Sequence, residues 1–526
     1  MLRSWGAVQE DLAFLRNQCL YYAAGHAPAD TNTTTIRHGL YAQSPFSKAG
    51  EVDLAASGFS LAGLPAAVAN GIITSNAAYQ IAAEAAHQVH LMVAHSAAAT
   101  KPEEIRRYGY GGMLCHYPAW DNEAGEFRAA PGVEFSSIDT TLLMYGLLVS
   151  ANYFGGEVRT EYEAARNAIH WRDWFDSRTP GHRNQMRMSY WPGSGFFAWW
   201  DWYTQEAMLI GVFAAMSDPS IEPVKVWQSW RRDLQTYTSP APDSRSFTCY
   251  TTFFGDPFTL VYGQAFFDFA RFPQDIDDQN WFSQAQTAYQ ASVEYFRRER
   301  GYQGGLTAGF SICAPNGVMS KPNGKRIEPV QRFDGTLYTL AGGLSYYGNE
   351  VTANPLAVRL SDLLRHTPGF LGWHGWPVAS VNATNLAYPA VCERIIGQDI
   401  AFVGLAIDNY LEHRAQDLVL QDPAMRRTLN QIFPPRTVPA WTSVSRMELS
   451  CQGIPFTLAN LQKAEYPRGG WATVTSAVFS VGGVCQLAFP TDSTQRFFRL
   501  DAEPGWAPLS APTRPRIVPV AQMGAR

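Results

Sequence analysis

The chain has 526 residues, of which 46% are hydrophobic and 17% are charged, and its formal net charge is -5 at pH 7. This length predicts either a few domains or one large barrel, and the hydrophobic content is enough for a sizeable core. The low charge and the lack of a long basic run argue against nucleic acid as the main partner, because neutralising phosphates needs clustered Lys and Arg.

The most informative feature of the composition is its aromatic content, with 16 Trp, 24 Tyr and 30 Phe. Aromatic rings pack against the apolar faces of sugar rings, so this composition fits a carbohydrate-binding cleft. A large core built from bulky rings would give the same composition. The composition alone leaves both interpretations open.

The N-terminal residues Met1–Trp5 lack the charged and apolar segments of a secretion signal. The protein is therefore expected in the cytoplasm or, after removal of a signal, in the periplasm or outside the cell. No stretch is predicted to span a membrane, because the longest weakly polar segment, Ala66–Ala98, carries Glu84 and several His at helical spacing. No pattern predicts an oligomeric state.

Helical periodicity dominates the chain from Ala7 to Ile432, where it predicts about a dozen helices separated by long loops rich in Gly and aromatic residues. The helices are expected over Val8–Ala24, Leu61–Asn70, Ser75–Ala97, Ser137–Phe154, Arg159–Phe175, Tyr203–Ala215, Val224–Tyr237, Phe258–Phe269, Asn280–Arg298, Thr336–Ser345, Asn354–Thr367 and Asp399–Arg414. Long ordered loops in a compact domain are usually functional. A double ring of helices with functional loops at one end fits this pattern.

The pattern changes after Pro434 and Pro435. Strand propensity and turn residues predict strands over Trp471–Val481, Val484–Phe489 and Thr494–Leu500. We therefore predict a helical catalytic domain over residues 1–435, a small β-rich module over 436–502 and a tail rich in Pro and Ala over 503–526. Of the seven Cys, Cys451 and Cys485 form a candidate pair within the module, and the others are predicted to be buried thiols.

The first acidic candidate is Asp139. Ser136 or Ser137 is expected to cap the helix that follows, which puts Asp139 in its first turn, where the helix dipole favours the ionised carboxylate. The alternative is a carboxylate that only stabilises the helix.

The second candidate is Glu206, which begins an otherwise apolar helix. An aromatic cluster precedes it and surrounds Asp201 and Glu206; its members are Trp199, Trp200, Trp202 and Tyr203. A carboxyl group beside several indole rings is desolvated, which raises its pKa, and a raised pKa suits a general acid at neutral pH. The alternative is a glutamate that bonds to a neighbouring loop.

Further polar and aromatic residues fall in the predicted loops. Asp399 precedes an apolar helix, and Asp334 is expected either to cap a helix or to bind a sugar hydroxyl. Four more candidates for sugar binding are His116, Trp373, His374 and Trp376. Purely structural roles remain the alternative for each. We expect no metal and no cofactor, because dinucleotide, phosphate-loop, zinc-helix and nucleophile-elbow motifs are absent from the sequence.

Short motifs between Val52 and Gln416 occur in the order found in one known group of proteins. They are Ala56–Leu61 followed by Val68–Ile73, Ser137–Gly146, Tyr203–Leu209, Gly304–Ala308, Asp334–Thr336 and Ile396–Asp399. Together they resemble the glucoamylase-like glycoside hydrolases, which include bacterial endo-β-1,2-glucanases and the related domain of cyclic β-1,2-glucan synthase.

This resemblance implies a mostly α fold, an (α/α)6 barrel, and hydrolysis of a β-linked glucan, β-1,2-glucan above all, with inversion at the anomeric carbon. It implies an oligo- or polysaccharide as the partner, with no membrane or nucleic acid. Glu206 would be the general acid. Asp399 would be the first candidate for the base, with Asp139 close behind. Asp139 and Asp334 would otherwise bind substrate.

The sequence departs from this group in the loops that shape the sugar subsites. Gln205 stands where the group has Asn, and the Gln-Gly-Pro that follows the aspartate in the group is missing after Asp399. The resemblance therefore predicts the fold more firmly than the substrate. A transglycosylase, an exo-acting relative on another β-glucan and an inactive glycan-binding protein stay as alternatives.

Overall fold

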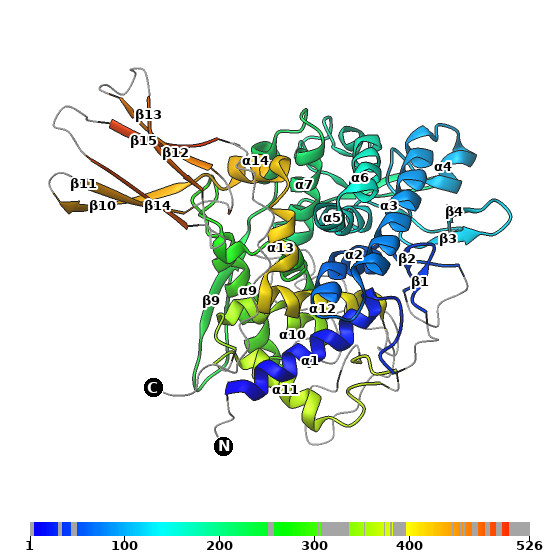
Figure 1. The fold of residues 1–526 in the computed structure, drawn as a ribbon, viewed down its shortest axis with the longest axis horizontal. Coiled ribbons are helices and arrows are strands. Elements are labelled where there is room, and N and C mark those ends of the chain that lie inside the picture. Colours follow the sequence, from blue (N-terminus) through cyan, green and yellow to red (C-terminus); the bar gives the residue numbers. More distant parts are fainter. Residues whose placement is uncertain are drawn as a thin grey trace. The chain divides into compact units, whose positions relative to one another are not determined.

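The computed structural model describes residues 5–29, 34–43, 50–250, 257–302, 304–306, 336–351, 353–372, 374–378, 381, 396–443, 446–452, 455, 458–464, 472–478, 484–490 and 497–503. Asp334 and Trp373 lie outside these ranges. The chain forms two compact units, Met1–Pro434 and Pro435–Arg526 (Figure 1). Within the described ranges, no helix has the length and apolar character needed to cross a membrane.

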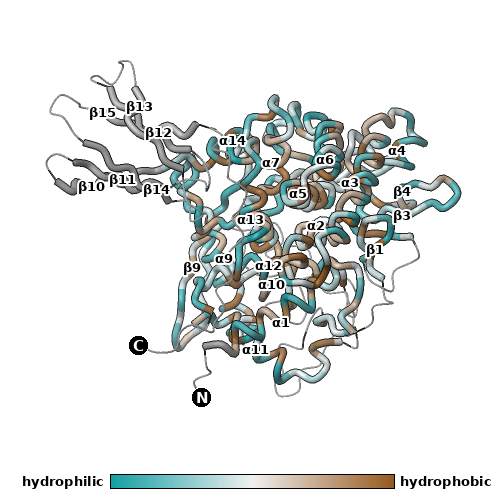
Figure 2. Tube along the Cα trace, viewed as in Figure 1, coloured by the Kyte–Doolittle hydropathy of each residue, from teal (hydrophilic) through white to brown (hydrophobic). Residues whose placement is uncertain are grey.

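The centre of the first unit is a ring of helices that are buried on nearly all sides. Each element contacts the next, and the last contacts the first. In order, the ring consists of α2 (Leu54–Ala69), α5 (Ser137–Phe154), α7 (Gln205–Ser217), the short 3-10 helices η2 (Pro257–Leu260) and η3 (Tyr262–Ala265), α10 (Leu337–Gly342) and α12 (Gly397–Glu412). Figure 2 shows hydrophobic residues gathered along these central elements.

A second layer of helices covers the ring on the outside. The α3 helix packs on α6, α1 packs on α12 and α11, and α14 packs on α7. The outer layer consists of α1 (Trp5–Ala23), α3 (Ser75–Ala98), α4 (Pro102–Tyr108), α6 (Gly156–Ala168), α8 (Pro223–Gln228), α9 (Trp281–Glu299), α11 (Pro355–His366), α13 (Arg414–Val419) and α14 (Pro423–Ile432). This double ring is an (α/α)6 barrel, so the predicted fold class is confirmed.

The backbones of α2 and α5 touch at two glycines. A Cβ atom on Gly58 would overlap the carbonyl group of Leu142, and a Cβ atom on Gly146 would overlap the backbone of Gly58. The two helices can approach this closely only because neither position carries a side chain. This contact fixes the spacing of two neighbouring elements of the inner ring.

We expect Gly58→Ala to lower the free energy of unfolding by about 2–3 kcal/mol, because a methyl group forced against backbone cannot be relieved by a rotamer change. Thermal and denaturant unfolding of the full chain would measure the change. Gly63→Ala, in the same helix, is the matched control. Its Cβ would lie 3.4 Å from the Leu20 side chain and 3.5 Å from that of Ala23, which is ordinary contact. Equal midpoints for the two variants would contradict this interpretation of the helix contact.

Several predicted helices differ from the structure. The one expected over Arg159–Phe175 ends at Ala168 as α6 and is followed by η1 (Trp171–Trp174). The helix expected over Leu61–Asn70 begins earlier, at Leu54, because the Asp53 side chain accepts a hydrogen bond from the Ala56 amide and caps it. The helix expected over Phe258–Phe269 is replaced by η2 and η3, and η4 (Phe269–Arg271) follows.

The helix expected over Val224–Tyr237 ends as α8 at Gln228, and the chain continues as strand β8 (Leu234–Thr238), which pairs with β9 (Ser246–Tyr250).

Short strands accompany the barrel in the first half of the chain. An antiparallel sheet is formed by β5 (Phe135–Ser136), β6 (Arg187–Trp191) and β7 (Gly195–Trp199). Ser136 is both the end of β5 and the N-cap of α5. The other pairs are β1 (Ile36–Arg37) with β2 (Leu40–Tyr41) and β3 (Pro118–Asp121) with β4 (Glu126–Ala129).

The described part of the second unit consists of strands. Two three-stranded antiparallel sheets have the orders β10-β11-β14 and β13-β12-β15. Their bounds are β10 (Arg436–Ser443), β11 (Arg446–Gln452), β12 (Leu458–Ala464), β13 (Ala472–Val478), β14 (Val484–Pro490) and β15 (Phe497–Glu503). The backbone register places Cys451 directly opposite Cys485. This register is compatible with the predicted disulfide between them, which stays a prediction.

Candidate active site

Three of the four predicted acids lie in the first turns of inner helices. Asp139 is in the first turn of α5, Glu206 in that of α7 and Asp399 in that of α12. All three are largely buried, with exposed fractions of 6%, 7% and 8%. Each helix therefore presents one carboxyl group at its N-terminal end.

Hydrogen bonds show that these helix starts lie at one end of the barrel. The Trp200 indole, just before α7, donates to the Ser137 hydroxyl of α5 at 2.9 Å. The Gly263 amide of η3 donates to the Gln205 amide oxygen of α7 at 2.6 Å. The Gln398 side chain of α12 donates to the Tyr262 hydroxyl of η3 at 2.8 Å. We call this end, where α5, α7, η3 and α12 begin, the barrel mouth.

His116 forms the electrostatic centre of the mouth. Its Nε2 lies 3.5 Å from Oδ1 of Asp139, and its Nδ1 lies 3.7 Å from Oε1 of Glu134. Burial disfavours the charged ring, but the negative charges of Asp139, Glu134 and Asp53 outweigh it and raise the pKa of His116 to about 9. With this pKa the ring carries a positive charge at neutral pH, and its closeness to Glu134 lowers the pKa of that carboxyl.

Asp399 has a different environment from Asp139. Burial, and then the nearby charge of Asp53, raise the pKa of Asp399 well above its ordinary value. Burial also raises the pKa of Asp53 to about 6, although the His116 charge partly opposes this rise. Among the described residues, neither Oδ2 of Asp53 nor Oδ2 of Asp399 has a hydrogen-bond partner. The mouth thus holds one carboxyl beside His116 and two carboxyls whose pKa is raised by burial.

The sequence interpretation missed Asp53, which lies at the start of α2 with an exposed fraction of 0%. The signal was present, because an aspartate directly before an apolar helix is a typical N-cap. It was hidden because Ser57, Gly58 and Ser60 weaken the helical pattern over the first two turns of α2.

Most of the predicted aromatic platform is packed against protein in this structure, and the role of these rings as sugar contacts stays a prediction. The Trp199 ring lies between the His182 ring at 3.9 Å and the Arg187 guanidinium at 4.2 Å, so both of its faces are occupied. Trp200 is buried, and its indole nitrogen is bonded to Ser137. Tyr203 is buried with its ring centroid 3.9 Å from that of Trp281.

The described residues of the second predicted platform are also packed inside the protein, and their role as sugar contacts stays a prediction. Trp376 is fully buried and packs edge-on against Tyr22 at 5.5 Å, and His374 is also buried. These side chains belong to the core in this structure. Trp202 is half-buried, with the Arg231 guanidinium 4.3 Å from its ring centroid, and its role as a sugar contact stays a proposal.

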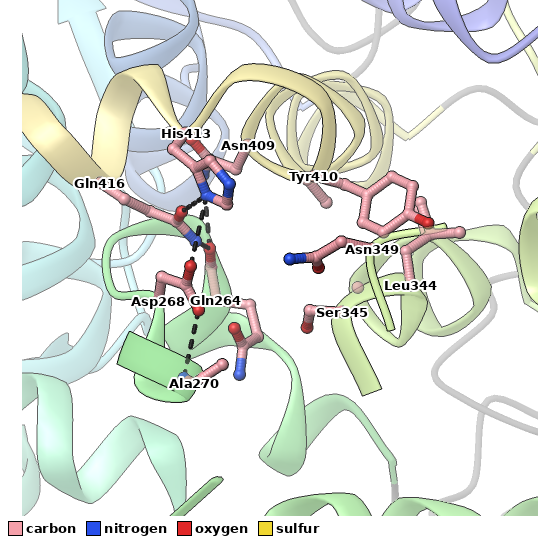
Figure 3. Close-up of a pocket in the computed structure, with 13 residues that line it drawn as sticks. Gln264, Asp268, Ala270, Leu344, Ser345, Asn349, Asn409, Tyr410, His413 and Gln416 are labelled. Atoms are coloured by element: carbon pink, nitrogen blue, oxygen red, sulfur yellow. Dashed lines mark hydrogen bonds and ion pairs between the residues drawn. The ribbon is translucent and has the colours of Figure 1, made fainter. Parts of the chain in front are cut away.

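A separate polar pocket lies at the other end of the barrel (Figure 3). It includes Asn409 and His413 at the end of α12, about 20 Å along the helix axis from Asp399. Its amide side chains hold helix ends together: Asn409 donates to the Ala265 carbonyl at 2.8 Å and Gln416 to the Gln264 carbonyl at 2.7 Å. Its described lining includes none of Asp139, Glu206 and Asp399, which all lie at the mouth.

Comparisons with protein-family models and with curated proteins give no match. Solved structures do match. A glucoamylase-like protein from Bacteroides uniformis is 12% identical with a TM-score of 0.60, covering 81% of this chain and 97% of that one. The chain has the glucoamylase-like fold.

Two further structures with this fold are endo-β-1,2-glucanases. The enzyme from Chitinophaga pinensis, in complex with sophorotriose and glucose, is 13% identical with a TM-score of 0.57, covering 81% of this chain and 97% of that one. The enzyme from Talaromyces funiculosus, in complex with sophorose, is 10% identical with a TM-score of 0.52, covering 80% of this chain and 88% of that one.

Proposed function

We propose that this protein is a glycoside hydrolase that cleaves a β-linked glucan, with β-1,2-glucan as its substrate and inversion at the anomeric carbon. The observation that carries the proposal is the set of carboxyl groups on the first turns of three inner helices, α5, α7 and α12, at the mouth of a glucoamylase-like barrel. Endo-β-1,2-glucanases are among the structures with the same fold.

In this mechanism Glu206 donates a proton to the oxygen of the leaving sugar. A second carboxylate, Asp399 or Asp139, takes a proton from a water molecule that attacks the anomeric carbon from the opposite ring face. The two carboxyl groups of an inverting enzyme stand roughly 6.5–9.5 Å apart, which leaves space for this water. No metal is needed, because the acid and the base supply both proton transfers.

The two base candidates differ in their electrostatics. Asp139 lies with its Oδ1 3.5 Å from Nε2 of His116. Burial and the charge of Asp53 raise the pKa of Asp399, so as a base it would act only as the pH rises through this elevated pKa. The pH dependence of kcat/KM therefore distinguishes the two base candidates. A base with a raised pKa shifts the acidic limb of the profile to higher pH.

The test is a reducing-end assay of the full chain on linear β-1,2-, β-1,3-, β-1,4- and β-1,6-glucans, with the products sized and the first-formed anomer followed by NMR. We expect new reducing ends on β-1,2-glucan and α-anomeric products. Lengthened chains without new reducing ends would show a transglycosylase. Release of one small product from a chain end would show an exo-acting enzyme. Binding without cleavage of any glucan would overturn the hydrolase assignment.

A further inference from the structure

The hairpin formed by β6 and β7 carries two exposed aromatic side chains. Trp191 has an exposed fraction of 38% and Phe197 of 62%. In the antiparallel register Trp191 lies opposite Gly195, and Phe197 lies opposite Ser189. Both rings therefore point to the same side of the hairpin. The facing residues, Gly195 and Ser189, are too small to cover the rings.

The opposite side of the hairpin fixes it to the barrel. The Tyr190 ring stacks on that of Tyr110 at 4.5 Å with an interplanar angle of 8°. The Phe196 ring meets that of Trp174 edge-on at 5.2 Å. A side chain held on a fixed hairpin loses little further freedom on binding, so the two exposed rings form a preorganised surface.

The exposed rings stand next to the helix that carries Asp139. Ser136 pairs with Ser189, and Ser189 pairs with Phe197, so the three residues form one row across the sheet. At the usual strand spacing, Phe197 lies about 10 Å from Ser136. The Ser136 hydroxyl accepts a hydrogen bond from the Asp139 amide at 3.3 Å. A few sugar units would bridge this distance.

We propose that Trp191 and Phe197 form an outer binding site for a β-glucan chain, which holds sugar units that extend beyond the barrel mouth. This inference rests on the proposed function and deepens it, because an outer site favours long chains as substrates. Pyranose rings are neutral and have apolar faces that pack on aromatic rings. The hairpin matches a neutral ligand, because Arg187 is the one charged residue in the sequence from 187 to 199 and its guanidinium is bound to Asp176 at 2.6 Å.

The size of this surface favours a sugar over a second copy of the chain. The two rings together expose roughly 200 Å², given the area of aromatic side chains. A stable protein interface needs about 800 Å² from each partner. One or two sugar rings fit the smaller area, so the surface matches a polysaccharide strand better than a protein.

The test compares the double variant Trp191→Ala/Phe197→Ala with the wild-type chain on long β-1,2-glucan and on the shortest oligosaccharide that the enzyme cleaves. Affinity electrophoresis in gels containing the polymer measures binding separately from cleavage. Tyr153→Ala is the matched control, because Tyr153 is 41% exposed but lies at the end of α5 away from Asp139.

We expect the double variant to lose about tenfold in affinity for the polymer and to show a higher KM on it, while kcat/KM on the shortest substrate stays unchanged. Tyr153→Ala should match the wild type throughout. Equal effects on long and short substrates, no effect on either, or a changed sedimentation mass would overturn the outer site. A wild-type chain that neither binds nor cleaves β-glucan would instead refute the proposed function itself.

Discussion

Replacing Glu206 with glutamine should lower the turnover of β-glucan by about a hundred to ten thousand fold, because general acid catalysis contributes this much to a rate. Glutamine keeps the shape of the side chain but has no proton to give to the leaving oxygen. Glu206 is buried in the first turn of α7, so an amide of equal size should preserve the helix. Kinetics on the polymer, glucan binding and the melting temperature would be measured together.

An aryl glycoside sharpens this experiment. A phenol of low pKa leaves without protonation. If Glu206 is the acid, Glu206→Gln should therefore lower kcat far less on such a substrate than on glucan. The control is Glu222→Gln, since Glu222 lies on the surface and is paired with Lys225, and it should behave as the wild type. Unchanged kcat in Glu206→Gln would remove this residue from the mechanism.

Replacing Asp399 with asparagine should have a second large effect, a loss of about a hundred to ten thousand fold if its carboxylate activates the water. Burial and Asp53 raise the pKa of Asp399, and a base acts only when it is deprotonated. Wild-type kcat/KM should therefore increase as the pH rises through the elevated pKa of Asp399. Azide, which needs no general base, should restore cleavage by the variant and give a glycosyl azide of inverted configuration.

Asp139→Asn is the companion variant that separates the two base candidates. If Asp399 is the base, Asp139→Asn should keep much of its kcat and remain insensitive to azide. Asp139 also helps to raise the pKa of His116 to about 9. Removing its charge should bring the His116 pKa down toward the ordinary value, so the imidazolium should be lost at lower pH, which NMR titration of the ring would detect. Azide rescue of Asp139→Asn alone would assign the base to Asp139.

Local signals in the sequence were sufficient for the helices that carry the three predicted acids. The Ser136 cap places Asp139 in the first turn of α5, as expected, and the structure begins α7 and α12 within two residues of their predicted starts. Caps and apolar runs are local, so one sequence can reveal them. Asp53 was missed although its cap is also a local signal, because Ser57, Gly58 and Ser60 weaken the helical pattern at the start of α2.

The aromatic residues show the opposite outcome. A run such as Trp199–Tyr203 predicts exposed rings near an acid as readily as buried ones. The Trp199 ring is packed against Arg187 and His182, and the Tyr203 ring against Trp281. These partners lie outside the run, so the run alone could not reveal the packing. The exposed pair Trp191 and Phe197 was missed because the hairpin register that turns both outward depends on pairing between strands.

One position of the inner ring is occupied by short 3-10 helices, whereas the others are occupied by α-helices. Between α7 and α10 the ring is closed by η2 and η3, whose hydrogen bonds have poorer geometry than those of an α-helix. By contrast, α2 and α5 cannot move closer together, since their backbones already touch at Gly58 and Gly146. At η2 and η3 the ring therefore depends on side chains from its neighbours, since the Gln205 side chain of α7 accepts a hydrogen bond from the Gly263 amide and the Gln398 side chain of α12 donates one to the Tyr262 hydroxyl.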